Sequence, residues 1–191
     1  MTPTEQLKEE HKAIKSALDI LEKICQRIDA KKEVKPSDIE NMLDFIRTFA
    51  DKCHHGKEED LLFPALEETG IPREGGPTGM MLMEHTQGRN YVKGAAEAFS
   101  KFGKEDETAK EIFTQNVKNY ISLLREHIDK EDNILYMIAD MHIPEEVQKE
   151  LLEKFQKVEE EKIGQGKHEE FHRILEELKK LFAQHINKDI L

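Results

Sequence analysis

Apolar side chains recur with a period near 3.6 along almost the whole chain, and no stretch alternates with the period of two that is typical of a strand. The first such run places Leu7, Ile14 and Leu18 on one stripe. Similar stripes follow wherever glycine and proline clusters do not interrupt the chain. Because an amphipathic helix must bury its apolar stripe against another element, the pattern predicts an all-α fold.

Capping and helix-breaking residues predict where the helices lie. A Thr-x-x-Glu box at Thr2, followed by proline, predicts the first start, and a Ser-x-x-Glu box at Ser37 predicts the second. Pro64 predicts that the second helix loosens or bends nearby. Two further long helices flank a polar break at residues 103–107. Four long helices with modest connections predict an antiparallel four-helix bundle over residues 1–142.

The last segment, residues 143–191, is expected to add to this bundle. Two shorter apolar stripes cover about residues 145–163 and 167–187, with a Gly-Gln-Gly segment between them. They predict a helical hairpin that packs on the bundle within the same domain. Glu159 and His168 are placed to face the bundle, where each either packs or adds a metal ligand, and packing is the favoured interpretation.

The net charge excludes several classes of partner. The chain has 29 Lys and Arg against 40 Asp and Glu, a formal net charge of -11. Such a surface repels nucleic acid phosphates and anionic lipids, and the apolar runs are too short to cross a bilayer. The first residues lack the pattern of a secretion signal. We therefore expect a cytoplasmic protein without a nucleic acid or membrane partner, while a protein partner stays open.

Histidine and glutamate positions reveal an internal repeat. Glu10-His11 matches Glu84-His85, and the spacing of His54, Lys57 and Glu58 matches that of the residues at 127, 130 and 131. The repeated marks are displaced by 74 and 73 positions. Two like helical hairpins predict a pseudo-twofold bundle in which equivalent groups converge at the centre.

The repeated groups interrupt the apolar stripes, so they point into the bundle. Residues four apart share one face of a helix, which lets each His-x-x-x-Glu pair reach one ion. A buried carboxylate needs a compensating charge, and its two oxygens can bridge two ions. Nitrogen and oxygen ligands without thiolate favour iron or manganese, with zinc as the alternative. The predicted metal ligands are His11, His54, Glu58, His85, His127 and Glu131.

Several neighbouring residues leave alternatives open. His55 either binds the second ion or donates a hydrogen bond behind it, and we include it among the metal ligands. Tyr120 either donates to a bound ligand or fills the core. Glu59 is expected in solvent, and its alternative is to bind metal in place of Glu58. Core histidines paired with carboxylates would account for one His-x-x-x-Glu pair, but less well for two pairs related by a repeat.

Four motifs in order resemble the hemerythrin-like, HHE cation-binding family: Glu10-His11, the run 53–64 (Cys-His-His-Gly-Lys-Glu-Glu-Asp-Leu-Leu-Phe-Pro), the run 84–89 and the run 127–132. The resemblance covers about residues 5–140. It implies a four-helix bundle that holds an oxo- or carboxylate-bridged, non-haem di-iron centre, with the six repeated histidines and glutamates as ligands. It also implies a C-terminal helical extension, as some family members have.

The chain departs from the oxygen-carrying hemerythrins at two positions. Those proteins have a further histidine near the third-helix ligand and an aspartate in the last motif, whereas this chain has Arg89 four residues after His85, and Glu131. Arg89 is expected to pair with an acidic residue instead. The resemblance therefore does not by itself imply that this chain carries oxygen reversibly.

The favoured function is a protein that binds two iron ions and binds or senses dioxygen, nitric oxide, peroxide or iron status. Two other classes stay open. One is a di-iron oxidoreductase acting on peroxide or nitric oxide, and the other is an iron donor or repair factor for iron centres. No nucleophile with an adjacent base is present in the sequence pattern, so no catalytic residue is assigned.

Overall fold

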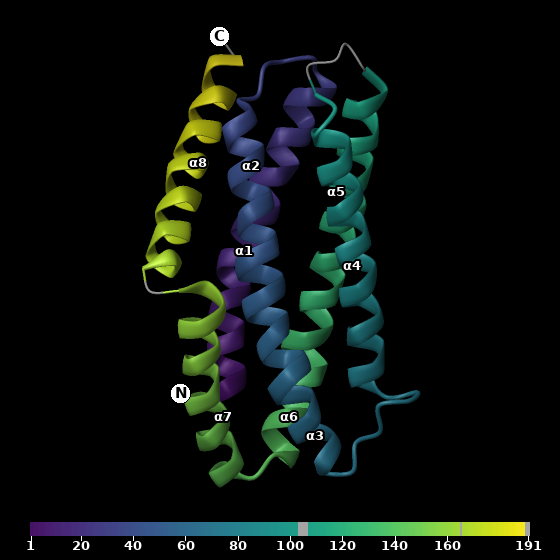
Figure 1. Cartoon of the computed structure of the whole chain (residues 1–191), viewed down its shortest axis with the longest axis vertical. Coiled ribbons are helices and arrows are strands. Elements are labelled where there is room, and N and C mark those ends of the chain that lie inside the picture. Colours follow the sequence, from purple (N-terminus) through teal and green to yellow (C-terminus); the bar gives the residue numbers. More distant parts are fainter. Residues whose placement is uncertain (103–106, 165, 190–191) are drawn as a thin grey trace.

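A computed structural model describes residues 1–102, 107–164 and 166–189, which form helices joined by short connections (Figure 1). Four long rods run alternately up and down: α1 (Pro3–Asp29); α2 (Pro36–Phe45) continued by η1 (Ile46–His55), η2 (Glu58–Leu62) and α3 (Phe63–Glu68); α4 (Pro77–Phe99); and α5 (Glu107–Lys130) continued by η3 (Glu131–Leu135) and α6 (Tyr136–His142). The described residues contain no strand, so the all-α prediction is confirmed. Of the predicted polar break at residues 103–107, positions 103–106 lie outside the described residues, and α5 begins at position 107.

The two predicted helix starts have different outcomes. At the first, the Glu5 amide donates to Thr2 Oγ1 (3.2 Å) and the Thr2 amide donates to Glu5 Oε2 (2.8 Å), so the capping box is confirmed. At the second start, the prediction that Ser37 caps the helix is wrong. The helix begins at Pro36, because proline with its fixed φ suits the first helical position, and this leaves Lys35 as the capping residue.

The second and fourth rods contain π-helical turns at corresponding places. The Phe63 amide donates to the Glu58 carbonyl and the Tyr136 amide donates to the Glu131 carbonyl, each five residues back. The rod around Pro64 stays helical, because the wider turn before it accommodates a residue that has no amide hydrogen. Each of the two turns begins at a predicted metal-binding glutamate.

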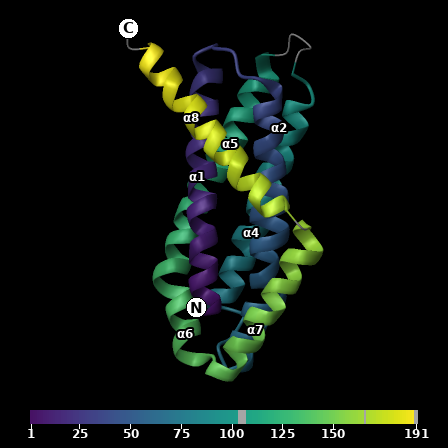
Figure 2. The same cartoon turned by 90° about the vertical axis from the view of Figure 1, so that its left-hand side faces the viewer.

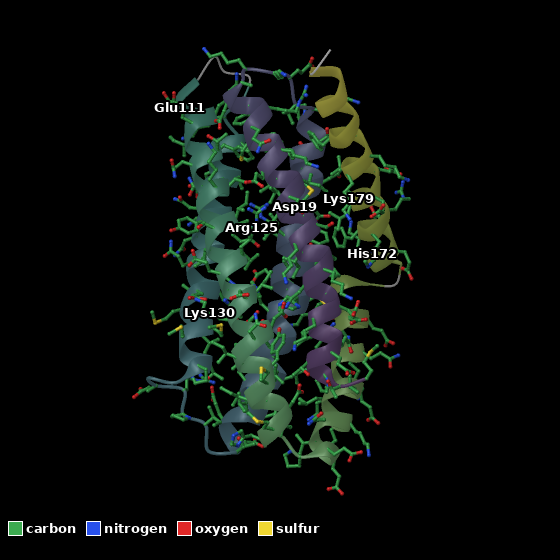
Figure 3. All side chains as sticks on the ribbon, turned by 180° about the vertical axis from the view of Figure 1, so that it is seen from behind. Asp19, Glu111, Arg125, Lys130, His172 and Lys179 are labelled. Carbon is green, nitrogen blue, oxygen red and sulfur yellow. The ribbon has the colours of Figure 1, made fainter. Side chains whose placement is uncertain are left out.

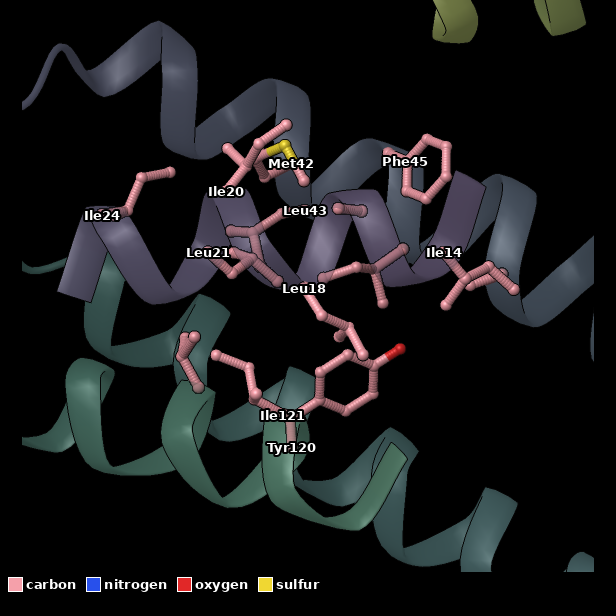
Figure 4. Close-up of a cluster of buried hydrophobic side chains, with 14 of the residues drawn as sticks. Ile14, Leu18, Ile20, Leu21, Ile24, Met42, Leu43, Phe45, Tyr120 and Ile121 are labelled. Atoms are coloured by element: carbon pink, nitrogen blue, oxygen red, sulfur yellow. The ribbon is translucent and has the colours of Figure 1, made fainter. Parts of the chain in front are cut away.

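Two apolar clusters form the core, one in each half of the bundle. The upper apolar cluster contains Ile14, Leu18 and Tyr120 and fills the space between α1, the second rod and α5 (Figure 4). The lower apolar cluster contains Leu7 and Phe63. His11 lies one helical turn from both Leu7 and Ile14, so a buried polar layer separates the two clusters. On the surface above this layer, Arg125 and Asp19 join α5 to α1 by an ion pair of 2.9 Å (Figure 3).

The last helices lie end to end along one side of the bundle. α7 (Glu145–Val158), continued by η4 (Glu159–Ile163), covers the lower half, and α8 (Lys167–Asp189) crosses the upper half (Figure 2). Phe155 joins the lower apolar cluster and Phe171 the upper one. This arrangement differs from the expected hairpin, because Gly164 turns the chain at φ 88° without reversing it. The side chain of His168 lies outside the described part of the chain. None of the described helices is long and apolar enough to cross a bilayer.

Truncation of Phe171 should destabilise the whole molecule. Its ring is 1% exposed and packs edge-on against Phe45 and Phe49 of the second rod. We expect Phe171→Ala to lower the free energy of unfolding by about 3–5 kcal/mol, measured by urea denaturation followed by circular dichroism. Arg173→Ala, at a side chain that is 66% exposed, is the control and should change it by less than about 0.5 kcal/mol. A wild-type urea midpoint for Phe171→Ala would mean that α8 adds nothing to the folded core.

Candidate metal centre

All seven side chains predicted as metal ligands are buried, and they converge between the two apolar clusters. The four-residue cluster consists of His55, Glu58, His85 and His127, and the three-residue cluster consists of His11, His54 and Glu131. Within each cluster, one nitrogen or oxygen atom per residue lies within 4.8 Å of the others. The rods therefore bring together two adjacent groups of potential ligands.

Glu131 lies between the two clusters. Its Oε2 atom is 3.2 Å from His11 Nε2, and its Oε1 atom is 3.0 Å from His127 Nε2. Glu58 also lies between them, since its Oε2 atom is 3.5 Å from His85 Nε2 and 3.8 Å from His54 Nε2. Each glutamate can thus contact an ion in either cluster, as a bridging carboxylate must.

Each of the five clustered histidines donates its Nδ1 proton to a carboxylate. The pairs are His11 with Asp132 (2.7 Å), His54 with Glu10 (2.9 Å), His55 with Asp51 (3.4 Å), His85 with Glu59 (2.7 Å) and His127 with Glu84 (2.9 Å). An ionised carboxylate only accepts, so the neutral ring keeps its hydrogen on Nδ1 and presents the Nε2 lone pair to the interior. Carboxylates orient metal-binding histidines in this way.

Lysines and arginines hold these outer carboxylates in turn. Lys15 donates to Asp132 at 2.9 Å, and Lys57 to Glu10 at 2.6 Å. The other contacts are those of Lys130 with Glu84 and of Arg89 with Asp51 (2.8 Å) and Glu59 (2.7 Å). Arg89 thus pairs with acidic residues, as expected. The expectation that Glu59 lies in solvent is wrong, because the His85 ring and Arg89 both donate to it.

Glu159 contacts the edge of this network. It accepts hydrogen bonds from Lys57 and from Gln6 Nε2, the latter at 2.7 Å. It belongs to neither cluster of potential ligands. Its observed contacts are therefore those of an ion-pair partner, which links η4 to the Lys57 side of the centre.

The hydrogen bonds follow the internal repeat. Glu10 holds His54 within the first hairpin, as Glu84 holds the histidine at 127 in the second. Glu59 reaches across to His85, as Asp132 reaches across to the histidine at 11. The pseudo-twofold relation predicted from spacing alone therefore extends to the residues that orient the rings.

Two positions break the repeat. His55 corresponds to Ile128, so only the four-residue cluster gains a third imidazole, whose ring stacks on His85 at 3.8 Å. Tyr136 corresponds to Phe63, and its hydroxyl donates to Glu58 Oε1 at 2.7 Å. Tyr136 was not among the predicted site residues, although the hydroxyl that distinguishes it from Phe63 was the available signal. Tyr120, the other candidate, belongs to the upper apolar cluster.

Four buried atoms of the two clusters fit a cation. His54 Nε2, Glu58 Oε2 and both carboxylate oxygens of Glu131 have no hydrogen-bond partner in the part of the chain that is described. His85 Nε2 and His127 Nε2 face each other at 3.0 Å. Buried acceptors without donors are costly, and a metal ion would satisfy them together.

Protons provide the compensating charge when no cation is bound. Burial and the nearby Glu131 carboxylate raise the pKa of Glu58 well above its usual value. Burial also raises the pKa of Glu131, but the nearby imidazoles of His127, His11 and His85 outweigh it and leave that pKa well below the usual value. The metal-free centre is therefore expected to hold one protonated and one ionised glutamate.

The model of the hemerythrin HHE cation binding domain family matches residues 2–139. The chain belongs to this family. Uncharacterized proteins of Mycobacterium bovis and Mycobacterium tuberculosis are 25% identical to it over 136 residues, which is 71% of this chain and 52% of theirs. The chain thus spans about half the length of these curated relatives. No solved structure gives a significant match.

Family membership and the two clusters together make the chain a cation-binding protein. The matched region ends before α7, so Glu159 comes from outside it. Where oxygen-carrying hemerythrins have a further histidine on the third helix, this chain has Arg89, and His55 from the second rod joins His85 in the four-residue cluster. A third imidazole is therefore present, but on a different rod.

Removal of Lys57 should be far more damaging than removal of its repeat equivalent, Lys130. Lys57 is 0% exposed and its loss leaves the buried Glu10 carboxylate without a cation, whereas the Lys130 side chain is 31% exposed. We expect Lys57→Met to lower the free energy of unfolding by about 3–5 kcal/mol, and Lys130→Met by about 1 kcal/mol or less. Urea denaturation of the metal-free proteins measures both, and equal losses would contradict the difference in burial.

The stability of the metal-free protein should peak near the ordinary histidine pKa of 6.5. Burial lowers the pKa of His54 to about 4, so unfolding takes up a proton and stability falls as the pH drops from 6.5 to 4. Burial also opposes the charged form of His127, but the Glu131 carboxylate outweighs burial and raises the pKa of His127 to about 9. Unfolding then releases a proton, so stability falls as the pH rises from 6.5 to 9. Urea midpoints across this range measure both effects. His127→Gln should flatten only the alkaline side, and a flat wild-type profile would contradict both assignments.

Proposed function

We propose that the protein binds two iron ions as a carboxylate-bridged pair and uses their open coordination positions to bind or sense dioxygen, nitric oxide, peroxide or iron status. The placement of Glu131 carries the proposal. One of its oxygens faces each cluster, and neither has a hydrogen-bond partner among the described residues. Two buried, unpaired oxygens that point to separate groups of histidines are what a bridging ligand requires.

The donor atoms favour iron over a structural zinc ion. Both clusters offer imidazole nitrogen and carboxylate oxygen only, and neither Cys25 nor Cys53 belongs to them. Burial raises the pKa of both cysteines to about 12, so neither offers a thiolate. Such a ligand set suits iron or manganese, and the bridged pairs of the family resemblance favour iron.

The two ions would have unequal surroundings. The four-residue cluster supplies three imidazoles and Glu58, whereas the three-residue cluster supplies two imidazoles and Glu131. With fewer protein ligands, the three-residue cluster leaves more room for a small ligand. A reduced iron pair supplies electrons to a diatomic ligand or peroxide when it is bound.

Tyr136 lies beside the more open side of the centre. Its hydroxyl is 3.4 Å from His11 Nε2 while it donates to Glu58, so it fixes one oxygen of that glutamate. Leu7, one helical turn before His11, and Phe63, five residues after Glu58, belong to the lower apolar cluster and are fully buried. They exclude water from this half of the bundle. The chain thus orients its ligands in an interior that is largely shielded from solvent.

Metal content and optical spectra test this proposal. After anaerobic loading with ferrous iron, the protein should bind two ions per chain and develop the absorption bands of a bridged ferric pair in air. His54→Ala and His127→Ala should each lose metal and these bands, because each removes an imidazole from one cluster. His142→Ala, at an exposed position beyond the centre, is the control.

Two ions retained in both ligand variants would contradict the assignment. Turnover of added peroxide or nitric oxide that is lost in Glu131→Ala would instead place the protein among di-iron oxidoreductases. Rapid and complete removal of the iron by a chelator would favour the donor or repair function. Binding spectra without turnover, together with slowly exchanging iron, are the result we expect.

A further inference from the structure

A cavity separate from the two clusters lies between the second rod, α4 and α5. Its volume is about 280 Å³, which suits a molecule smaller than most drug-like ligands. The lining residues used below are Ile46, Arg47, Gly88, Val92, Lys93 and Tyr120. His55 and Asp51 also line it, so an occupant would lie beside the four-residue cluster without belonging to it.

The Tyr120 hydroxyl is an unpartnered polar group at this cavity. The residue is 4% exposed, and its ring packs in the upper apolar cluster near Leu18 and Ile121 (Figure 4). Within the described ranges its hydroxyl makes no hydrogen bond. Burial raises the pKa of Tyr120, so the group stays protonated and can donate. The hydroxyl is therefore free to donate a hydrogen bond to a molecule in the cavity that Tyr120 lines.

Gly88 keeps the cavity open. It lies in the interior of α4, where glycine costs about 1 kcal/mol of helix stability relative to alanine. A Cβ atom at this position would meet Tyr120 Cε2 at 3.5 Å, an ordinary contact, so close packing does not require glycine here. The absent side chain instead leaves space over the Tyr120 ring.

Positively charged side chains line this cavity. Arg47 has no ion-pair partner in the ranges that the structure describes, and Lys93 makes one long, exposed ion pair with Glu97 at 4.0 Å. Arg89, in contrast, is already bound to Asp51 and Glu59. The chain has a net charge of -11, so a local group of cationic side chains attracts small anions to this cavity in particular.

We propose that this cavity binds a small organic anion, with its acid group at Arg47 and Lys93 and its apolar part against Val92 and Tyr120. Ile46 and the Tyr120 ring supply the apolar wall, and the glycine at position 88 supplies the room. The site is formed by the fold itself, so the inference does not depend on the proposed di-iron function.

Benzoate is a suitable probe, since it combines a flat apolar ring with one carboxylate. We expect saturable, one-to-one binding of benzoate by titration calorimetry in both metal-free and iron-loaded protein, and at least tenfold weaker binding of benzyl alcohol, which has the same ring without the charge. Absence of saturable benzoate binding at millimolar concentration would overturn the proposal, as would equal affinity for the two probes.

Variants separate the contributions of shape and charge. Gly88→Leu fills the cavity and should abolish benzoate binding. Arg47→Gln should weaken benzoate binding at least fivefold, and it provides the test if Gly88→Leu does not fold. Lys93→Ala should weaken binding severalfold. Lys154→Ala is its matched control, because Lys154 is an exposed helical lysine whose glutamate partner is also 4.0 Å away.

Two results on the variants would count against the site. Unchanged benzoate affinity in folded Gly88→Leu would place the ligand elsewhere, and an equal effect of Lys93→Ala and Lys154→Ala would reduce it to general charge attraction. Iron content measured on the same samples keeps the two proposals distinguishable. Benzoate binding in a protein that holds no iron would leave this inference intact while the di-iron function failed.

Discussion

The hydrogen bonds from five histidine Nδ1 atoms to carboxylates determine how the interior of this bundle is organised. Each bond fixes the orientation of one ring, and together they turn every Nε2 atom towards the space that Glu58 and Glu131 share. Such a polar layer is stable inside a protein only when its carboxylates are paired and its acceptors are satisfied. The division of the apolar core into two clusters, and the ring of lysines and arginines around the layer, both follow from this requirement.

The π-helical turns lie where the polar groups of the interior meet. A regular α-helix separates consecutive side chains by about 100°, which would direct His55 away from the face that holds His54. The segment η1 ends with these two histidines, both of them buried, and wider turns begin at Glu58 and at Glu131. Turns of this kind are frequent at functional sites. Here two of them begin at glutamates predicted as ligands, so the local backbone and the proposed chemistry are closely linked.

Much of this organisation is visible in the sequence, because its signals are local. His11 interrupts an apolar stripe, and the second His-x-x-x-Glu pair repeats the first, which sufficed to predict the helices and the residues that converge. The role of Glu59 could not be read in this way, since its partner His85 lies on another rod. The path of α8 depends on a turn at Gly164, whose angle no periodicity encodes. The contact of the Tyr136 hydroxyl with Glu58 was not predicted, because Tyr136 and Phe63 occupy equivalent positions in the repeat.

The contact between Glu159 and Lys57 has a consequence for the order in which the molecule is made. Ribosomes synthesise a chain from its N-terminus, and all seven histidines and glutamates predicted as ligands precede position 132. Glu159, which completes the ion pairs around Lys57, Glu10 and His54, emerges only later. A nascent bundle therefore contains every potential ligand before its His54 side has been closed by the last part of the chain.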